Sequence, residues 1–321
     1  GPPYPPSGAA LGGTPTIPVD VPITSVFLLL FILGAGMHMG IFQFNKKKAH
    51  KFLMTLLVFG FCMCRIVTMA LRISWATEPR NIKLGIAAMI FVQAGTVLLF
   101  VVNMIFAQRI IRAQHPTVGW SKAFDVFCRL IIVVIVLTLI ALITVTVLSF
   151  YTLDTYTRHV AHVVQVYGST YYAAIAALPI PMVILGLVVP RRIRTEKFGK
   201  GRFRTKIGVL LASSILLSIG AIWRCVTTWL DPTLADDPWY MGKAPFYTCN
   251  FTVEFLVVLL FAAVRVDRRF HVPNGAKGRG SYHTLPGANG EFPKNMDWKQ
   301  HELARKPSVL RIFSEEELFD D

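Results

Sequence analysis

The chain has 321 residues, of which 54% are hydrophobic and only 16% are charged, and its mean hydropathy is +0.52. A soluble globular protein could not bury that much apolar surface, so the composition excludes that class and is typical of a protein that crosses a membrane several times. The formal net charge of +15 comes from Lys and Arg in short loops and one tail beside the apolar runs. That placement indicates membrane orientation and argues against nucleic-acid binding.

Seven apolar runs follow one another along the chain. Each is long enough to cross ~30 Å of hydrocarbon as a helix of about 20 residues. We therefore predict an all-α integral membrane protein whose single domain, residues 23–266, is a bundle of seven transmembrane helices. In chain order, the predicted spans are residues 23–44, 52–73, 84–105, 126–148, 169–189, 207–230 and 246–266.

Lys and Arg alternate between the loops in step with the spans. One set of short loops holds 15 basic residues and the other set holds 4. Because translocation of basic loops is disfavoured, the basic side is expected to be cytoplasmic, with the N-terminus outside and the C-terminus inside. The most basic loop, residues 190–206, carries eight Lys or Arg residues, and we expect it to attract anionic lipids of the inner leaflet.

The segments outside the spans are polar. Residues 1–22 are rich in Pro, Gly and Thr, which predicts a disordered extracellular segment, and residues 267–321 predict a mostly disordered cytoplasmic tail. The largest predicted external connection is residues 151–166, where His159 and His162 stand at helical spacing, so part of it is expected to lie as a helix at the interface. No third ligand stands at a suitable spacing, so neither a metal nor a cofactor is expected.

Few charged side chains fall at membrane depth, where they usually face the bundle interior. At 1.5 Å per residue, Arg65 lies about 20 Å from the inner start of the second span, and Glu254 about 12 Å from the outer start of the seventh. In a core of ~30 Å these depths nearly coincide, and Arg224 lies slightly nearer the outer face. Glu254 is the only deep acidic residue expected, so we predict that it contacts Arg65 or Arg224.

Aromatic and amide side chains surround these three charges at the same predicted depth. One interpretation is a buried ion pair that holds the helices together. A second, compatible interpretation is a polar pocket open to the outside, whose surplus positive charge suits a ligand with an anionic or polar head. The predicted ligand-binding residues are Arg65, Gln93, Tyr171, Tyr172, Trp223, Arg224, Tyr247, Asn250 and Glu254.

Motifs that would indicate catalysis or light absorption are missing from the chain. The seventh predicted span has no Lys that could form a retinal Schiff base. The sequence contains no Gly-x-Ser-x-Gly, His-Glu-x-x-His or P-loop motif. We therefore do not expect an enzyme.

Short motifs in three spans and the tail resemble fungal seven-helix membrane proteins. They are residues 60–65 (GFCMCR), 70–75 (ALRISW), 222–224 (IWR), the pair Phe246-Tyr247, and 265–275 (RVDRRFHVPNG). The motifs in the spans resemble the lipid-translocating-exporter-like family, and the tail motif is more similar to an ascomycete membrane family with no assigned function. The exporter-like pattern implies an acidic residue near the Arg of the second and sixth spans, which this chain lacks. The resemblance also extends to fungal receptor-like proteins, although the triplet after the third span is Ala-Gln-Arg and gives G-protein coupling no motif support.

Together these features predict a receptor-like or sensor protein, in the plasma membrane, that binds a small amphiphilic ligand in the outer half of the bundle. One alternative is a lipid or toxic-amphiphile exporter, and another is a structural scaffold whose polar residues only hold helices together. The expected partners are the lipid bilayer, anionic inner-leaflet lipids at residues 190–206, and the small amphiphile. Nucleic acid is not an expected partner, and the sequence names no cytoplasmic signalling partner.

Overall fold

The computed structural model describes residues 1–4, 11–47, 52–190, 195–196, 198–232, 238–273, 276 and 278–282. Every regular element in these ranges is helical, and seven helical segments are long and apolar enough to cross a membrane. Each segment overlaps one predicted span, which confirms the all-α fold with seven apolar helices. The placement of the bundle in a membrane and the orientation of its termini stay predictions.

Four of the seven segments are single helices of 28 residues or more, and a fifth, α2, has 25. The other two are built from pieces: one is interrupted at Leu178, where Pro179 has no N–H to donate, and one contains a π-helical stretch. The elements are α1 (Ile17–Lys47), α2 (Leu53–Thr77), α3 (Ile82–Gln114), α4 (Pro116–Gly119), α5 (Lys122–Tyr151), α6 (Thr155–Ala177), α7 (Pro179–Val188), α8 (Phe203–Leu230), the 3-10 turn η1 (Trp239–Met241), α9 (Lys243–Phe246), the π-helix η2 (Tyr247–Thr252), α10 (Val253–Ala263) and α11 (Val266–Arg269).

Two predicted segments are more helical than the sequence analysis expected. Helix α1 begins at Ile17, so the end of the predicted disordered segment 1–22 is helical. Helix α6 begins at Thr155, so most of the predicted connection 151–166 belongs to it. The reason is local capping: the Asp154 side chain accepts a hydrogen bond from the backbone N–H of Thr157 at 3.0 Å and starts the helix before the apolar run begins.

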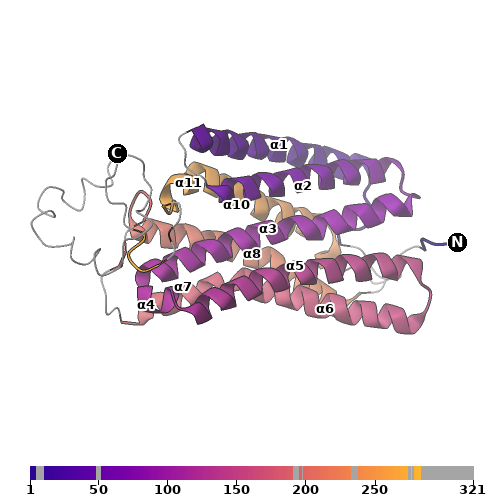
Figure 1. Cartoon of the computed structure of the whole chain (residues 1–321). Helices are drawn as coiled ribbons and strands as arrows, with labels where there is room; N and C mark the ends of the chain where they lie inside the picture. Colours follow the sequence, from indigo (N-terminus) through magenta and orange to yellow (C-terminus); the bar gives the residue numbers. More distant parts are fainter. Residues whose placement is uncertain are drawn as a thin grey trace, which may run out of the picture.

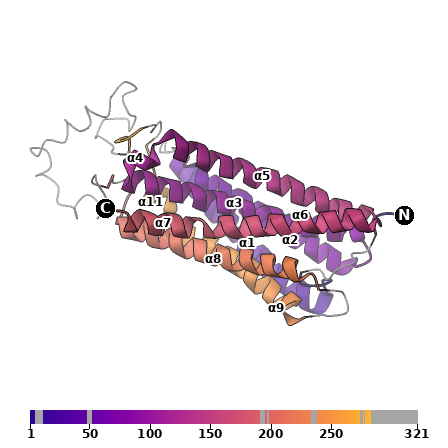
Figure 2. The ribbon, with the colours of Figure 1, turned by 90° about the horizontal axis from the view of Figure 1, so that it is seen from below.

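The helices pack side by side with nearly parallel axes (Figure 1). Helix α1 packs on α2 and α2 on α3, while α6 packs against α5 and α8, and α8 against α10. One end of the bundle, which we call the tail end, holds α4, α7 and α11 (Figures 1 and 2). The opposite end holds the start of α1 together with the turn between α5 and α6, and we call it the cavity end.

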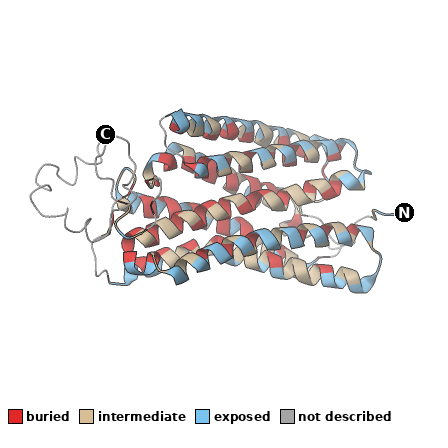
Figure 3. Cartoon of the chain, in the orientation of Figure 1, coloured by how far each residue is buried: buried red, intermediate tan, exposed pale blue. Residues whose placement is uncertain are grey.

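The outer faces of the bundle are apolar. Side chains along α5 such as Leu130, Val133 and Leu137 are more than half exposed in the isolated chain. Buried residues concentrate between the helices, and exposed ones follow the outer faces of α1, α5 and α6 (Figure 3). An apolar exterior of this extent around a buried core suits contact with lipid, in agreement with the expected bilayer partner.

The first part of the predicted disordered tail is folded against the tail end. The Phe270 ring is fully buried and stacks on Phe106 with ring centroids 4.1 Å apart. Asp267 accepts hydrogen bonds from Asn45 at 2.9 Å and from Arg265 at 2.8 Å. Burial favours the neutral acid, but these hydrogen bonds outweigh it, so the pKa of Asp267 is lowered. These contacts correct the prediction for residues 267–273; residues 283–321 lie outside the described part of the chain.

One cation of the basic loop 190–206 does not face lipid. Lys206 is buried, donates to the backbone carbonyl of Phe198, and lies over the Phe198 ring. Residues 191–194 and 197 lie outside the described ranges. The attraction of this loop for anionic lipids therefore stays a prediction. Lys206 is no longer counted among the residues expected to attract them.

Candidate functional site

Glu254, on the first turn of α10, is the centre of a buried charge cluster. Its Oε2 accepts a hydrogen bond from Arg65 Nε at 2.7 Å, and its Oε1 accepts from Arg65 Nη2 at 2.7 Å. The same Oε1 accepts from Arg224 Nη2 at 2.8 Å. Glu254 therefore contacts both arginines, which confirms the predicted contact and extends it to a second partner.

Arg65 is wholly enclosed, and all its donor groups are satisfied. Its side chain has no exposed surface, and Nη1 donates to the backbone carbonyls of Phe91 at 3.1 Å and Val92 at 3.0 Å. Close approach to α3 depends on Gly95, where an added Cβ would lie 3.2 Å from Arg65 Cζ. A fully satisfied guanidinium of this kind pins α2, α3 and α10 together.

Arg224 occupies the other side of Glu254 and is the more accessible of the two cations. Its Nη1 donates to Thr96 Oγ1 at 2.9 Å, and its Nε donates to Asn250 Oδ1. The Arg224 side chain keeps 15% of its surface exposed, whereas Arg65 keeps none. Two cations thus share one carboxylate, and only one of them is open to a ligand.

The π-helical turn η2 sets the position of Asn250. In this turn Asn250 Nδ2 donates to the carbonyl of Phe246 at 3.0 Å, which leaves its Oδ1 free to accept from Arg224. Gly220 of α8 permits the close approach, because an added Cβ would lie 2.5 Å from the carbonyl oxygen of Cys249. Single π-helical turns recur at functional sites, where they re-aim a side chain.

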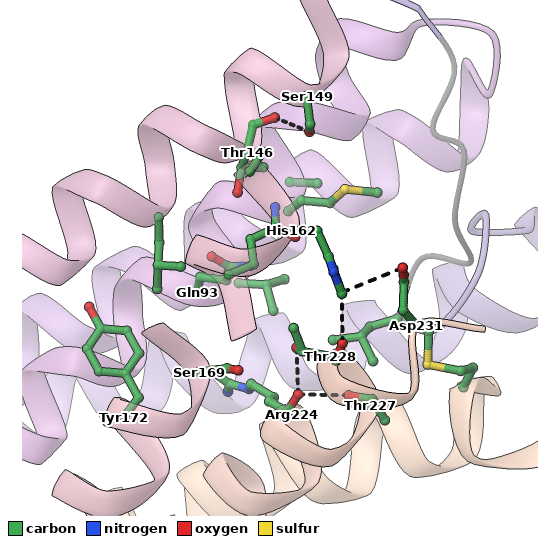
Figure 4. A pocket seen from close by; sticks show the side chains of 18 of the residues that line it. Gln93, Thr146, Ser149, His162, Ser169, Tyr172, Arg224, Thr227, Thr228 and Asp231 are labelled. Atoms are coloured by element: carbon green, nitrogen blue, oxygen red, sulfur yellow. Dashed lines mark hydrogen bonds and ion pairs between the residues drawn. The ribbon is translucent and has the colours of Figure 1, made fainter. Parts of the chain in front are cut away.

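A cavity of about 480 Å³ opens beside Arg224 at the cavity end, between α2, α3, α5, α6 and α8. Its apolar lining includes Phe100, Leu142 and Trp75. Polar side chains face it from several helices, including Gln93 of α3, Thr146 of α5 and Arg224 of α8 (Figure 4). Thr146 is 5% exposed, and its Oγ1 has no hydrogen-bond partner among the described residues.

The nine predicted ligand-binding residues divide into three groups. Three of them line the cavity, namely Gln93, Tyr172 and Arg224. Another three, Arg65, Asn250 and Glu254, lie behind the cavity wall as the partners of Arg224 or of one another. The remaining three, Tyr171, Trp223 and Tyr247, are not among the lining residues.

The last group points elsewhere because of how each helix is rotated. The Tyr171 hydroxyl donates to the carbonyl of Ile131 at 3.3 Å and ties α6 to α5. Tyr247 belongs to a different polar cluster, where its hydroxyl donates to Asp20 Oδ1 at 2.8 Å. The buried Trp223 Nε1 has no hydrogen-bond partner in the described part of the chain.

Asp20 forms a second buried charge cluster that sequence reasoning missed. Its Oδ1 accepts from Arg72 Nη2 at 3.0 Å, and its Oδ2 accepts from Lys243 Nζ at 2.5 Å. Asp20 is 1% exposed, so Glu254 is not the only acid buried in the bundle. Asp20 precedes the apolar run and falls in the segment predicted to be disordered, whereas α1 begins at Ile17 and buries it.

A stripe of polar residues on α6 was also missed, although the sequence carries its signal. Five residues recur at intervals of three or four, which places them on one face of a helix. All five line the cavity: Arg158, His162, Gln165, Ser169 and Tyr172. The spacing would have identified this face had the helix been predicted to begin before residue 169.

The mouth of the cavity carries a weak acid–base contact. His162 Nε2 lies 3.5 Å from Asp231 Oδ2 and 3.2 Å from the carbonyl oxygen of Thr228 (Figure 4). No group of three or more His, Cys, Asp or Glu side chains that could hold a metal ion occurs among the described residues. The side chains that line the cavity offer hydrogen bonding, charge and apolar contact to a ligand.

A family model described as "Protein of unknown function (DUF3112)" matches residues 199–271. This range runs from just before α8 to just after α11, so it contains Arg224, Asn250 and Glu254 but neither Arg65 nor the α6 stripe. No curated protein and no solved structure matches the chain. The resemblance to fungal exporter-like and receptor-like proteins stays a prediction.

Proposed function

We propose that this chain is a receptor-like or sensor membrane protein that binds a small amphiphile in the cavity beside Arg224. The observation that carries the proposal is the cavity itself, about 480 Å³ in volume, which is lined by both apolar and polar side chains. One of the polar groups, the Thr146 hydroxyl, has no hydrogen-bond partner among the described residues. Ligand pockets typically have volumes of ~300–1,000 Å³ and combine apolar walls with polar groups that orient the ligand. The alternation of basic loops predicts that the cavity end is outside, which supports a ligand that arrives from the extracellular side or the outer leaflet.

Packing below the cavity favours binding over translocation. Towards the tail end from Phe100, the α3–α8 interface is filled by Asn103, whose side chain hydrogen-bonds to Ser213 at 3.0 Å and to Ser214 at 3.2 Å. Asn103 and both serines are at most 1% exposed. An exporter would have to open this hydrogen-bonded contact in every cycle, whereas a sensor can keep it closed.

The test combines binding and flux in the same vesicles that contain the full chain. We expect a medium-chain amphiphile to bind saturably without being carried across. Met89→Trp, which places a large ring at the cavity wall, should abolish binding, while Met37→Trp, on the partly exposed face of α1, should leave it intact. Flux that depends on the protein would instead favour the exporter, and binding that survives Met89→Trp would refute the cavity as the site.

A further inference from the structure

The charges around Glu254 do not balance. Arg65 alone balances the charge of the carboxylate, and its Nε and Nη2 donate to both oxygens at 2.7 Å. Arg224 adds a second cation to Oε1, and no other carboxylate among the described residues forms an ion pair with it. The cluster of Arg65, Arg224 and Glu254 therefore carries one uncompensated positive charge inside the bundle.

That surplus charge faces the cavity and not the protein interior. Arg65 is fully enclosed, while Arg224 is partly exposed and lines the cavity wall. In a poorly solvated site, a guanidinium whose charge is not balanced attracts an anion more strongly than it would in water. Thr96 also lines the cavity, and its Oγ1 accepts from Arg224 Nη1, so it holds the guanidinium plane against the wall.

Two further arginines line the approach to Arg224. Arg158, on the α6 stripe, lines the part of the cavity nearer its mouth, and Arg72, which is paired with Asp20, lines it from α2. Among the described residues that line the cavity, Asp231 is the one with a carboxylate, and it lies at the mouth beside His162. The apolar residues Phe100 and Leu142 line the cavity deeper in the bundle.

From this arrangement we infer that the ligand's head group is a small anion, most simply a carboxylate, that binds Arg224 and takes the place of Glu254 Oε1 there. The inference rests on the proposed amphiphile-binding function and specifies the ligand class. Glu254 remains neutralised when this happens, because its bidentate pair with Arg65 is unchanged. The aliphatic part of the ligand then lies against the Phe100 and Leu142 side chains.

Three probes with the same chain and different heads test the inference: octanoate, octan-1-ol and octyltrimethylammonium. Each is titrated by calorimetry into the full chain in nanodiscs of zwitterionic lipid, with empty nanodiscs as the control for partitioning. We expect the Kd of octanoate to be at least about ten-fold lower than that of octanol, because octanoate adds a charge-assisted hydrogen bond. The cationic probe should bind weakest.

Substitutions locate the preference. Arg224→Gln should remove the advantage of octanoate while leaving octanol binding unchanged, and Arg224→Lys should retain part of it because the charge stays but the planar fork is lost. Arg80→Gln, in the exposed turn between α2 and α3 and not among the lining residues, removes the same charge as the matched control and should keep the preference. Arg224→Gln leaves a balanced Arg65–Glu254 pair, so it is expected to fold, and Arg224→Lys provides a second variant if it does not.

The outcomes separate the two proposals. Equal affinity for octanoate and octanol would overturn the anionic head while leaving the amphiphile-binding function standing. A preference for octanoate that survives both substitutions of Arg224 would overturn its assignment to that residue. Saturable binding of none of the three probes would overturn the inference and the proposed function together.

Discussion

The substitution Glu254→Gln tests the charge cluster most directly. It removes the carboxylate to which Arg65 and Arg224 both donate, at 2.7–2.8 Å. Breaking a buried ion pair by removing one partner costs about 3–5 kcal/mol, because the remaining charge stays desolvated. Here two cations lose the same partner, so we expect a loss at the upper end of that range. For a domain of this size the loss corresponds to a fall in Tm on the order of 10 °C.

Combined substitutions test whether the loss of stability comes from unbalanced charge. Arg224→Gln alone should cost only about 1 kcal/mol, because the Arg65–Glu254 pair stays balanced. Glu254→Gln with Arg65→Gln should recover only part of the loss, since Arg224 remains uncompensated, and adding Arg224→Gln should recover most of it. Thermal unfolding of the purified chain in detergent, followed by circular dichroism, measures each variant.

Glu78→Gln is the matched control, because Glu78 is an exposed acid at the end of α2. It should leave Tm within about 1 °C of the parent chain, as substitutions on exposed surfaces usually do. If Glu254→Gln behaves like this control, or if Arg224→Gln lowers Tm as much as Glu254→Gln does, then Glu254 does not balance the charges of Arg65 and Arg224 in the cluster.

Three further predictions concern other parts of the chain. Gly12→Ala should lower Tm more than Gly13→Ala. Both glycines have positive φ, but of the two only Gly12 would bring its new Cβ against a phenylalanine ring, 2.5 Å from Phe246. Equal shifts in Tm would argue against this close contact. Because the pKa of Asp267 is lowered from 3.8, its stabilising contribution is present above that value and is lost as pH falls through the lowered pKa. When unfolding is measured from pH 7 to pH 3, Asp267→Asn should therefore lose less stability than the parent chain. Parallel stability curves for the two chains would contradict this. A tag placed before Gly1 should be accessible on intact cells and one placed after Asp321 only after permeabilisation, and the reverse pattern would invert the extracellular placement of the cavity.

Helical rise along the predicted spans is enough to bring two charged residues of the site to one level. Arg65 and Glu254 are far apart in the chain, yet a constant rise per residue along each predicted span brings them to the same level. That calculation needs only the span ends and the hydrophobic thickness, both of which follow from local hydropathy. It therefore predicted the contact, although it could not decide between Arg65 and Arg224, because depth carries no information on helix rotation.

The same limit explains why three predicted site residues do not line the cavity. Tyr171 and Tyr172 are adjacent in the chain and at nearly the same depth, but only Tyr172 is on the cavity face of α6. Likewise Trp223 and Arg224 are neighbours that diverge by about 100° around the axis of α8. Which of two neighbours faces the cavity is decided by packing against adjacent helices, and no single span encodes that choice.

The sequence by itself determined the number of apolar helices and the presence of a charged level within the bundle, because hydropathy and helical rise are local properties. Only the tertiary structure decided that Asp20 is buried, that Glu254 is shared by two arginines, and that Arg224 alone of those two faces a cavity. The physical reason is that burial, charge balance and accessibility are properties of several helices at once. Each depends on how neighbouring helices are rotated and how closely they approach. Contacts between side chains that are distant in the chain determine both.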